Sequence, residues 1–371
     1  MKIAYVYDVI YPETIGGVEK RIHEIGIRLA GMGHEVHLYG MKYGPGPDTV
    51  TRDGLIIHGV CPAVSLYTQG RRSIMQAIRY TLALIPHLLH SDAEIIDCQN
   101  FPYLTVPVAC LAARLKGQVF LVTWHEFWGR YWYEYLGPAG LLGLGAERIA
   151  LWCSGRAAAV SPHTAELMAR AGYRDQPRII PNGIDLAYIR SVPPSQARSD
   201  LVFAGRFIPE KHPGLVVETV RELRKTIPDI RCIMIGDGPL AGEVREMIVS
   251  EGLSEHITCT GFIADHAEIM ALMKASRVFI LPSEREGFGI AALEAMACGL
   301  PLVTIDHPRN AASAHVIPGC GSVTRMDPHT LAEGVRSCLA GGLDPDALAS
   351  YAASHDWDRI AAEISAWYRS P

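Results

Sequence analysis

Two cations in the second half of the chain have a spacing that suits a polyanionic ligand. Arg206 and Lys211 stand five positions apart on a turn that follows a strand-like run. A helix-like run begins at Lys211, and the N-terminus of a helix favours negative charge. The pair taken alone is equally compatible with an exposed loop that carries ordinary surface charges.

Two carboxylates and a glycine turn follow the strand-like run that ends at Leu281. Gly289 opens a helix, and the free backbone amides of Phe288, Gly289 and Ile290 suit a phosphate. Glu294 stands about one turn inside that helix, where its carboxylate can accept hydrogen bonds from two hydroxyls of a sugar. Glu286 comes just before the helix. A carboxylate there would repel a phosphate, so we expect it to hold an uncharged sugar.

Three further positions could face the same ligand. Gly236, in a Gly-Asp-Gly turn after a strand, allows a close approach of the backbone, although a plain turn explains it as well. His125 follows another strand, at the end where ligands of parallel sheets bind. Gly16 and Gly17 form a loop that leads into a helix; a glycine-rich helix start is the alternative.

Aromatic residues gather between Trp124 and Tyr135, and a run rich in Leu and Gly follows at 139–145. These rings could stack on acceptor sugars, anchor at a bilayer interface, or form a core helix beneath the site. Three arginines could meet anionic headgroups or form an ordinary solvated face: Arg71, Arg72 and Arg79.

The elements that must position these residues alternate between strand and helix, which is typical of parallel α/β folds. In the first half the expected strands are Lys2–Tyr7, Glu35–Tyr39, Leu55–Val60, Glu94–Cys98, Gln118–Thr123 and Ala157–Val160. The expected helices between them include Val18–Gly31, Ser73–His90 and Tyr103–Leu115.

The second half repeats the scheme. Its expected strands are Asp200–Ala204, Arg231–Ile235, His256–Thr260, Val278–Leu281 and Pro301–Ile305, separated by helices at about 212–226, 241–252, 266–275 and 289–298. We read the Pro-rich break at 191–196 as a linker. The sequence thus predicts a domain over 1–190, a second over 191–355, and a helix over 356–371 that packs back on the first, with a cleft between two parallel sheets.

Composition agrees with a globular protein that has real cores. The 371 residues are 49% hydrophobic and 20% charged, and the net charge of −5 argues against a nucleic-acid partner. The nine cysteines form no Cys-x-x-Cys pair, so neither a disulfide framework nor a zinc site is favoured. The N-terminus reads as a strand rather than a signal peptide, and we expect a cytoplasmic protein with peripheral contact at the inner face of a membrane.

The spacing Glu286-x7-Glu294, with Gly205-Arg206-x4-Lys211 before it, resembles glycosyltransferase family 4, retaining enzymes of the GT-B fold. Gly16-Gly17-x-Glu19 and the segment 181–185 extend the resemblance over nearly the whole chain.

The resemblance implies a role for each matching position. The donor diphosphate would lie on Arg206, Lys211 and the amides of 288–290, the ribose on Glu294, and the transferred sugar on Glu286. His125 would lie beside the sugar's 6-hydroxyl. Gly16 and Gly17 would cover the phosphates, Gly236 would line the donor site, and the base would lie near Phe262.

The expected reaction moves a sugar from a UDP- or GDP-sugar to a glycan or lipid-linked acceptor in cell-envelope polysaccharide or glycoconjugate synthesis. Preorganised cations would stabilise the leaving diphosphate, and no Asp-x-Asp ends a strand, so we expect neither a metal nor a cofactor. Two alternatives stay open: a nucleotide-sugar 2-epimerase of the same architecture, and a non-catalytic protein that binds nucleotide sugars. Turnover would separate them.

Overall fold

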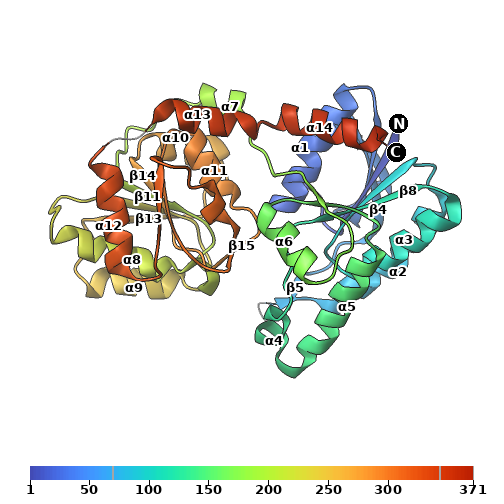
Figure 1. Ribbon diagram of the computed structural model, residues 1–371, viewed down its shortest axis with the longest axis horizontal. Coiled ribbons are helices and arrows are strands. Elements are labelled where there is room, and N and C mark those ends of the chain that lie inside the picture. Colours follow the sequence, from blue (N-terminus) through green and yellow to red (C-terminus); the bar gives the residue numbers. More distant parts are fainter. Residues whose placement is uncertain (69–70, 342–343, 371) are drawn as a thin grey trace. The chain divides into compact units, whose positions relative to one another are not determined.

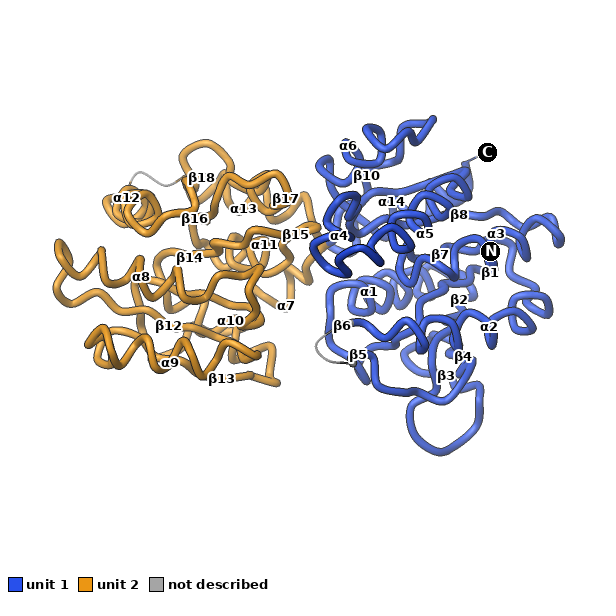
Figure 2. Tube along the Cα trace, turned by 90° about the horizontal axis from the view of Figure 1, so that it is seen from below, with its two compact units in different colours: residues 1–182, 357–371 blue, residues 183–356 orange. Residues whose placement is uncertain are grey.

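The computed structural model describes residues 1–68, 71–341 and 344–370, and they form two compact units. Unit 1 holds Met1–Asn182 together with Trp357–Pro371, and unit 2 holds Gly183–Asp356 (Figure 2). The first division comes eight residues before the expected end of the first domain. The chain's last helix belongs to unit 1.

The Pro-rich break at 191–196 lies inside unit 2 rather than between the units. Lys274 donates to the carbonyl oxygens of Ile189, Arg190 and Val192, and Ser195 donates its backbone N–H to Ala271. Because these bonds tie the segment to a helix of unit 2, the prolines do not create a flexible linker.

Unit 1 is built on an eight-stranded sheet that is parallel except at one edge. In spatial order its strands are β10 (Arg178–Ile179), β9 (Arg156–Ala159), β8 (Val119–Trp124), β7 (Ile95–Gln99), β1 (Lys2–Val6), β2 (Glu35–Lys42), β4 (Leu55–Pro62) and β3 (Thr49–Arg52). Only β3 runs antiparallel to its neighbour. A short ribbon, β5 (Tyr67–Thr68) with β6 (Arg71–Arg72), stands apart from the sheet.

Two layers of helices cover the two faces of this sheet (Figure 1). One layer is α1 (Gly17–Gly31) with α14 (Trp357–Arg369), and the other contains α2 (Ile74–His90), α3 (Thr105–Lys116) and α5 (Gly140–Cys153). The smaller helices are α4 (Tyr131–Leu136), η1 (Gly137–Ala139) and α6 (Pro162–Arg170). Alternation along β1 explains the two cores: Ala4 and Val6 face the layer of α2, while Ile3 and Tyr5 face that of α1.

Unit 2 has a six-stranded parallel sheet. In spatial order its strands are β13 (Ile257–Gly261), β12 (Cys232–Ile235), β11 (Leu201–Ala204), β14 (Val278–Leu281), β16 (Leu302–Ile305) and β18 (Gly321–Thr324). The helical segments are α7 (Leu186–Ser191), η2 (Pro209–Lys211), α8 (Pro213–Arg224), α9 (Ala241–Ser250), α10 (His266–Lys274), α11 (Ile290–Ala297), η3 (Ala311–His315), α12 (Pro328–Leu339) and α13 (Pro345–Ser354). A two-stranded ribbon, β15 (Arg285–Glu286) with β17 (Arg309–Asn310), lies outside the sheet.

Candidate active site

The predicted site residues divide between the units. Gly16, Gly17 and His125 belong to unit 1, and all the others belong to unit 2. In both units they follow strands of a parallel sheet at the carboxyl ends, where ligands of such sheets bind.

In unit 2 the turns after β11 and β12 are joined backbone to backbone. Gly205 donates its N–H to Ile235, and Phe207 donates to the carbonyl of Asp237 at 2.8 Å. A Cβ at Gly236 would lie 1.9 Å from the carbonyl oxygen of Gly205, so only glycine fits there. Gly236 therefore serves the packing of the turn that carries Arg206, which gives the plain-turn interpretation its physical basis.

The structure brings Lys211 and Glu286 together as an ion pair. Lys211 ends the short helix η2, two residues before α8 begins, so it stands beside the N-terminus of α8 and not in it. Arg206 is exposed, and within the described part of the chain it has no hydrogen bond or ion pair. Two cations and one carboxylate thus stand in the loops after β11 and β14.

A second carboxylate, Glu284, fixes the loop that carries Glu286. It pairs with Arg309 of β17, and its other oxygen lies 3.2 Å from Nε2 of His212. The backbone N–H of Glu284 also donates to Glu210. The ribbon β15–β17 and the loop before α8 are therefore held in one place by Glu284, a positioning residue that sequence reasoning missed because its partners are distant in the chain.

The turn that opens α11 is held by a buried histidine. His315 places Nε2 2.7 Å from the carbonyl oxygen of Phe288, and its Nδ1 lies 2.8 Å from the hydroxyl of Tyr351. Burial, with a smaller contribution from His355, lowers the pKa of His315 to about 4, so the ring is neutral at pH 7. Gly289 has a φ of +90°, and a Cβ there would meet the Cβ of Ala312 at 2.7 Å. These contacts fix the amides of 288–290.

Glu294 lies in α11 with its side chain largely buried, and Nε2 of His266 is 2.9 Å from its carboxylate. His266 in turn stacks on Tyr188, with ring centroids 5.6 Å apart. Phe262, just after β13, is 67% exposed and so presents a free aromatic face for a base. His266 was missed by sequence reasoning, because only the fold brings α10 beside α11.

In unit 1, a chain of hydrogen bonds sets the tautomer of His125. Its Nε2 lies 2.7 Å from Oε1 of Gln99, whose amide nitrogen donates to Asp97. Thr123 and Tyr368 also donate to Asp97, so its oxygens act as acceptors. Since an amide oxygen only accepts, Nε2 of His125 carries the proton and Nδ1 is the acceptor. Burial, with a smaller effect of Arg21, lowers the pKa of His125 to about 3. A neutral acceptor of this kind suits a sugar hydroxyl.

Gly16 and Gly17 form the start of α1, as the sequence predicts. The carboxylate of Glu19 lies against Gly16, where an added Cβ would meet it at 2.8 Å, and burial raises the pKa of Glu19. Gly16 is therefore needed so that Glu19 can fold back over the first turn of the helix.

The aromatic segment at 124–135 packs mainly inward, which favours the core interpretation over an aromatic membrane anchor. Trp124 and Trp132 are buried, Trp128 stacks against Trp132 at 4.6 Å, and of the rings in this segment only Tyr133 is exposed. The buried carboxylate of Glu147 in α5 holds the segment, since it accepts from the backbone N–H of Trp128 at 2.7 Å.

The three arginines proposed for headgroups have different outcomes. Arg72 makes two 2.9 Å hydrogen bonds to the fully buried Asp8, so its guanidinium is already engaged. The side chain of Arg71 lies outside the described residues. Arg79 is exposed on α2.

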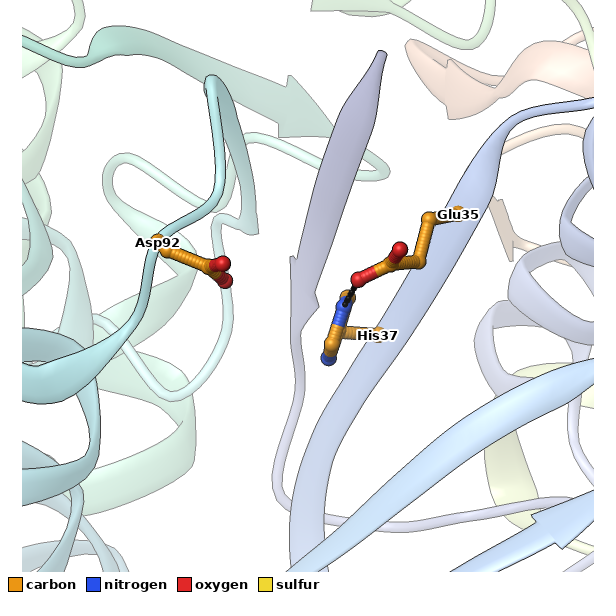
Figure 3. A group of neighbouring side chains, drawn as sticks. All are labelled: Glu35, His37 and Asp92. Carbon is orange, nitrogen blue, oxygen red and sulfur yellow. Dashed lines mark hydrogen bonds and ion pairs between the residues drawn. The ribbon is translucent and has the colours of Figure 1, made fainter.

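One group of side chains has the composition of a metal site: Glu35, His37 and Asp92, at the edge of unit 1 where β1 and β2 begin (Figure 3). The ammonium of Lys2 already lies 3.2 Å from Glu35 and 2.5 Å from Asp92. Because this cation neutralises both carboxylates, the group is better explained as a surface ion-pair cluster than as a metal centre. Among the described residues, no helix is long and apolar enough to cross a membrane.

Comparison with known proteins decides the family. Residues 188–355 match the family model of glycosyl transferases group 1, and residues 15–188 match that of Glycosyltransferase Family 4. The chain belongs to glycosyltransferase family 4. It is therefore an enzyme that transfers sugars, and the recognition from the Glu286-x7-Glu294 spacing is confirmed.

Solved structures of similar proteins confirm the GT-B fold. Sucrose-phosphate synthase from Thermosynechococcus elongatus superposes with a TM-score of 0.77 at 21% identity, over 99% of this chain and 98% of that one. HepE of Anabaena in complex with UDP gives a TM-score of 0.76 at 18% identity, over the full length of both.

Two curated relatives also align along most of the chain. A GDP-mannose-dependent α-(1-6)-phosphatidylinositol dimannoside mannosyltransferase of Mycobacterium tuberculosis is 27% identical over 92% of this chain and 88% of its own. One of the polypeptides named for the phosphatidylinositol N-acetylglucosaminyltransferase of Arabidopsis thaliana is 26% identical over 82% of this chain and 67% of its own.

Proposed function

We propose that the family 4 enzyme transfers a hexose from a UDP- or GDP-sugar to a lipid-linked or glycan acceptor with retention of the anomeric configuration. The observation that carries this proposal is the arrangement in unit 2. Arg206 is free of protein partners within the described residues, Lys211 pairs with Glu286, and the amides of 288–290 are held in a fixed turn.

The chemistry follows from where charge develops. When the bond between the sugar and the diphosphate breaks, negative charge grows on the leaving phosphate, and Arg206, Lys211 and the N-terminus of α11 can stabilise it. Glu286 would hold hydroxyls of the transferred sugar, and its pairing with Lys211 reduces its repulsion of the phosphate. Glu294 would hold the ribose, and the base would stack on Phe262. In unit 1, Nδ1 of His125 would accept from a sugar hydroxyl.

Two features support a lipid-linked acceptor. The curated relatives that align along most of the chain are named for phosphatidylinositol-based acceptors, and each moves a different sugar. We therefore propose that unit 1 receives a polar headgroup at a membrane surface. The donor base is left as uridine or guanosine, since GDP-mannose appears in one relative's name and UDP in the name of one solved complex.

A thermal-shift screen against nucleoside diphosphates and their sugars, with and without EDTA, tests the donor site first. A ligand at 100 times its dissociation constant stabilises a protein by about 2.7 kcal/mol. We expect a shift with one base that survives EDTA, because two side-chain cations do the work of a metal. The absence of a shift with every nucleotide would contradict the proposed donor. A shift that EDTA abolishes would contradict metal independence.

Turnover then separates transfer from the alternatives. We expect the sugar to appear on a phosphatidylinositol-type acceptor. Conversion of the free nucleotide sugar without an acceptor would indicate an epimerase, and binding without turnover would indicate a non-catalytic protein.

A further inference from the structure

The outer surface of the helix layer formed by α2, α3 and α5 in unit 1 has an unusual composition. Among the described residues, ten of the 23 exposed large hydrophobic side chains lie on these three helices, which contain 43 residues. They are Ile74, Met75, Leu82 and Leu89 on α2, Leu111 and Leu115 on α3, and Leu141, Leu142, Ile149 and Trp152 on α5. Soluble proteins rarely expose so many apolar groups together.

The three helices lie side by side, so their exposed residues form one surface. α3 packs against both α2 and α5, and all three cover the same face of the sheet (Figure 1). Along α5 the exposed residues follow the helical period, from Leu141 and Leu142 through Arg148 and Ile149 to Trp152. The buried side of each helix already fills the core, so the outer side is a separate feature.

The charges on this layer are of one sign. α2 and α3 contain no Asp or Glu, and the single acidic residue of α5, Glu147, is fully buried. Four cations stand exposed among the apolar groups: Arg79, Arg114, Lys116 and Arg148.

Unit 2 provides the contrast. Its neighbouring helices α8 and α9 carry acidic and basic residues together, and on them only Val249 is a large exposed hydrophobic residue. The surface of α2, α3 and α5 is therefore not simply what any outer helix of this protein looks like.

We infer that this surface, made of the outer sides of α2, α3 and α5, docks the enzyme on an anionic lipid bilayer. Apolar side chains and a tryptophan would enter the interface, while the four cations meet lipid phosphates. A second copy of the chain is a poor occupant, because a symmetric contact would oppose four cations to four cations. The inference goes beyond the proposed function, since it concerns binding to lipid without donor or acceptor.

Co-sedimentation with vesicles tests the inference, using pure phosphatidylcholine and an equal mixture with phosphatidylglycerol at low and high salt. We expect binding to the mixed vesicles that weakens with salt. Leu142→Gln with Trp152→Gln should reduce this binding at least about ten-fold. Arg79→Gln with Arg114→Gln should reduce it about five-fold for each charge removed. Neither arginine has a hydrogen bond or ion pair among the described residues.

Matched controls come from unit 2. Val249→Gln is equally exposed, and Arg198→Gln with Arg245→Gln removes the same charge elsewhere, so all three should leave vesicle binding unchanged. Equal losses in the patch and control variants would overturn the inference, as would failure of the wild-type protein to bind mixed vesicles. An oligomer that the Leu142 and Trp152 changes dissociate, without vesicle binding, would make the surface a protein interface and also overturn it.

The nucleotide thermal shift of the same variants keeps this test separate from the proposed function. Patch variants that lose vesicle binding should keep their nucleotide shift, because the donor residues lie in unit 2. Loss of the shift in the wild-type protein would contradict the donor proposal and leave the vesicle result standing.

Discussion

At the scale of single residues, the pair Lys211–Glu286 links the two tasks of the donor site. A lysine that binds a diphosphate and a glutamate that binds a sugar would oppose each other if each acted alone. Their ion pair reduces the repulsion between carboxylate and phosphate while leaving further donor and acceptor capacity on both side chains.

Replacing Glu286 by Gln should separate these tasks. The amide keeps the size of the side chain but loses the charge, so we expect turnover to fall by roughly 10² to 10³. Binding of the free nucleoside diphosphate should stay the same or become up to about ten-fold tighter, because Lys211 is no longer neutralised. Calorimetry and steady-state kinetics measure the two effects. Wild-type turnover with a verified acceptor would show that Glu286 has no role in transfer.

Lys211→Ala is the complementary change. It removes a cation and leaves Glu286 unneutralised, so nucleoside diphosphate binding should weaken by about 10- to 100-fold, measured by the same calorimetry. Arg245→Gln, which alters an exposed arginine on α9, is the control and should bind normally. Unchanged affinity in the Lys211 variant would place the diphosphate elsewhere.

His315 makes folding depend on pH in a defined window. The unfolded chain takes up a proton at an ordinary histidine pKa near 6.5, whereas the folded ring does so only near 4. Between these values the unfolded state holds more protons, so stability rises with pH there and falls as pH drops from about 6.5 to 4. The contribution is about 3 kcal/mol, fully present above pH 6.5.

His315→Gln should remove that contribution to the pH dependence. We expect its stability, measured by urea unfolding of unit 2, to lose less between pH 6.5 and 4 than that of the wild-type protein. His256→Gln, at a partly buried histidine whose Nδ1 lies 2.9 Å from the carbonyl oxygen of Ile230, is the comparison, and should retain the wild-type slope. Parallel slopes for wild type and His315→Gln would contradict the assignment.

At the scale of elements, the donor site depends on the turn between β14 and α11. The backbone there reaches a conformation that side chains rarely adopt, and Ala312 closes the space beside Gly289. His315 holds the carbonyl of Phe288 from the other side, so the helix begins with its amides in a fixed direction.

Gly289→Ala should disturb this turn. The added methyl is strained by the positive φ and by contact with Ala312, so we expect a loss of about 1–3 kcal/mol in stability and weaker nucleotide binding. Gly242→Ala, in the first turn of α9 with open space around it, should be neutral or stabilise by up to about 1 kcal/mol. Differential scanning calorimetry with and without nucleotide compares them. Equal behaviour of the two variants would show that the turn tolerates a side chain.

Local patterns predicted most of these elements, and long-range contacts account for what was missed. Val278–Leu281 and Trp357–Arg369 were predicted to the residue, because periodicity and flanking turns are local signals. β18 was missed, because Gly321–Thr324 is a short, only partly buried edge strand. Glu284, His266 and His315 were missed as site residues, because their partners lie at least 25 positions away.

At the scale of the whole molecule, unit 2 is an insertion in unit 1. The chain leaves unit 1 after Asn182 and returns at Trp357, and α14 then packs on α1. Trp357, Ile360, Ile364 and Trp367 of α14 belong to the core between the sheet and this layer, and Tyr368 donates to the buried Asp97 at 2.6 Å. Unit 1 therefore lacks part of its core until the last residues of the chain are in place.

Shortening α14's side chains should consequently affect unit 1 and spare unit 2. Ile360→Ala with Ile364→Ala removes two buried side chains, each worth about 2–5 kcal/mol, so unit 1 should unfold at a lower temperature. Nucleotide should still bind and raise the melting temperature of unit 2, since that core is complete without α14. Scanning calorimetry with and without nucleotide resolves the two transitions. Loss of both transitions together would mean that the units depend on each other for stability, against the independence that their separate cores predict.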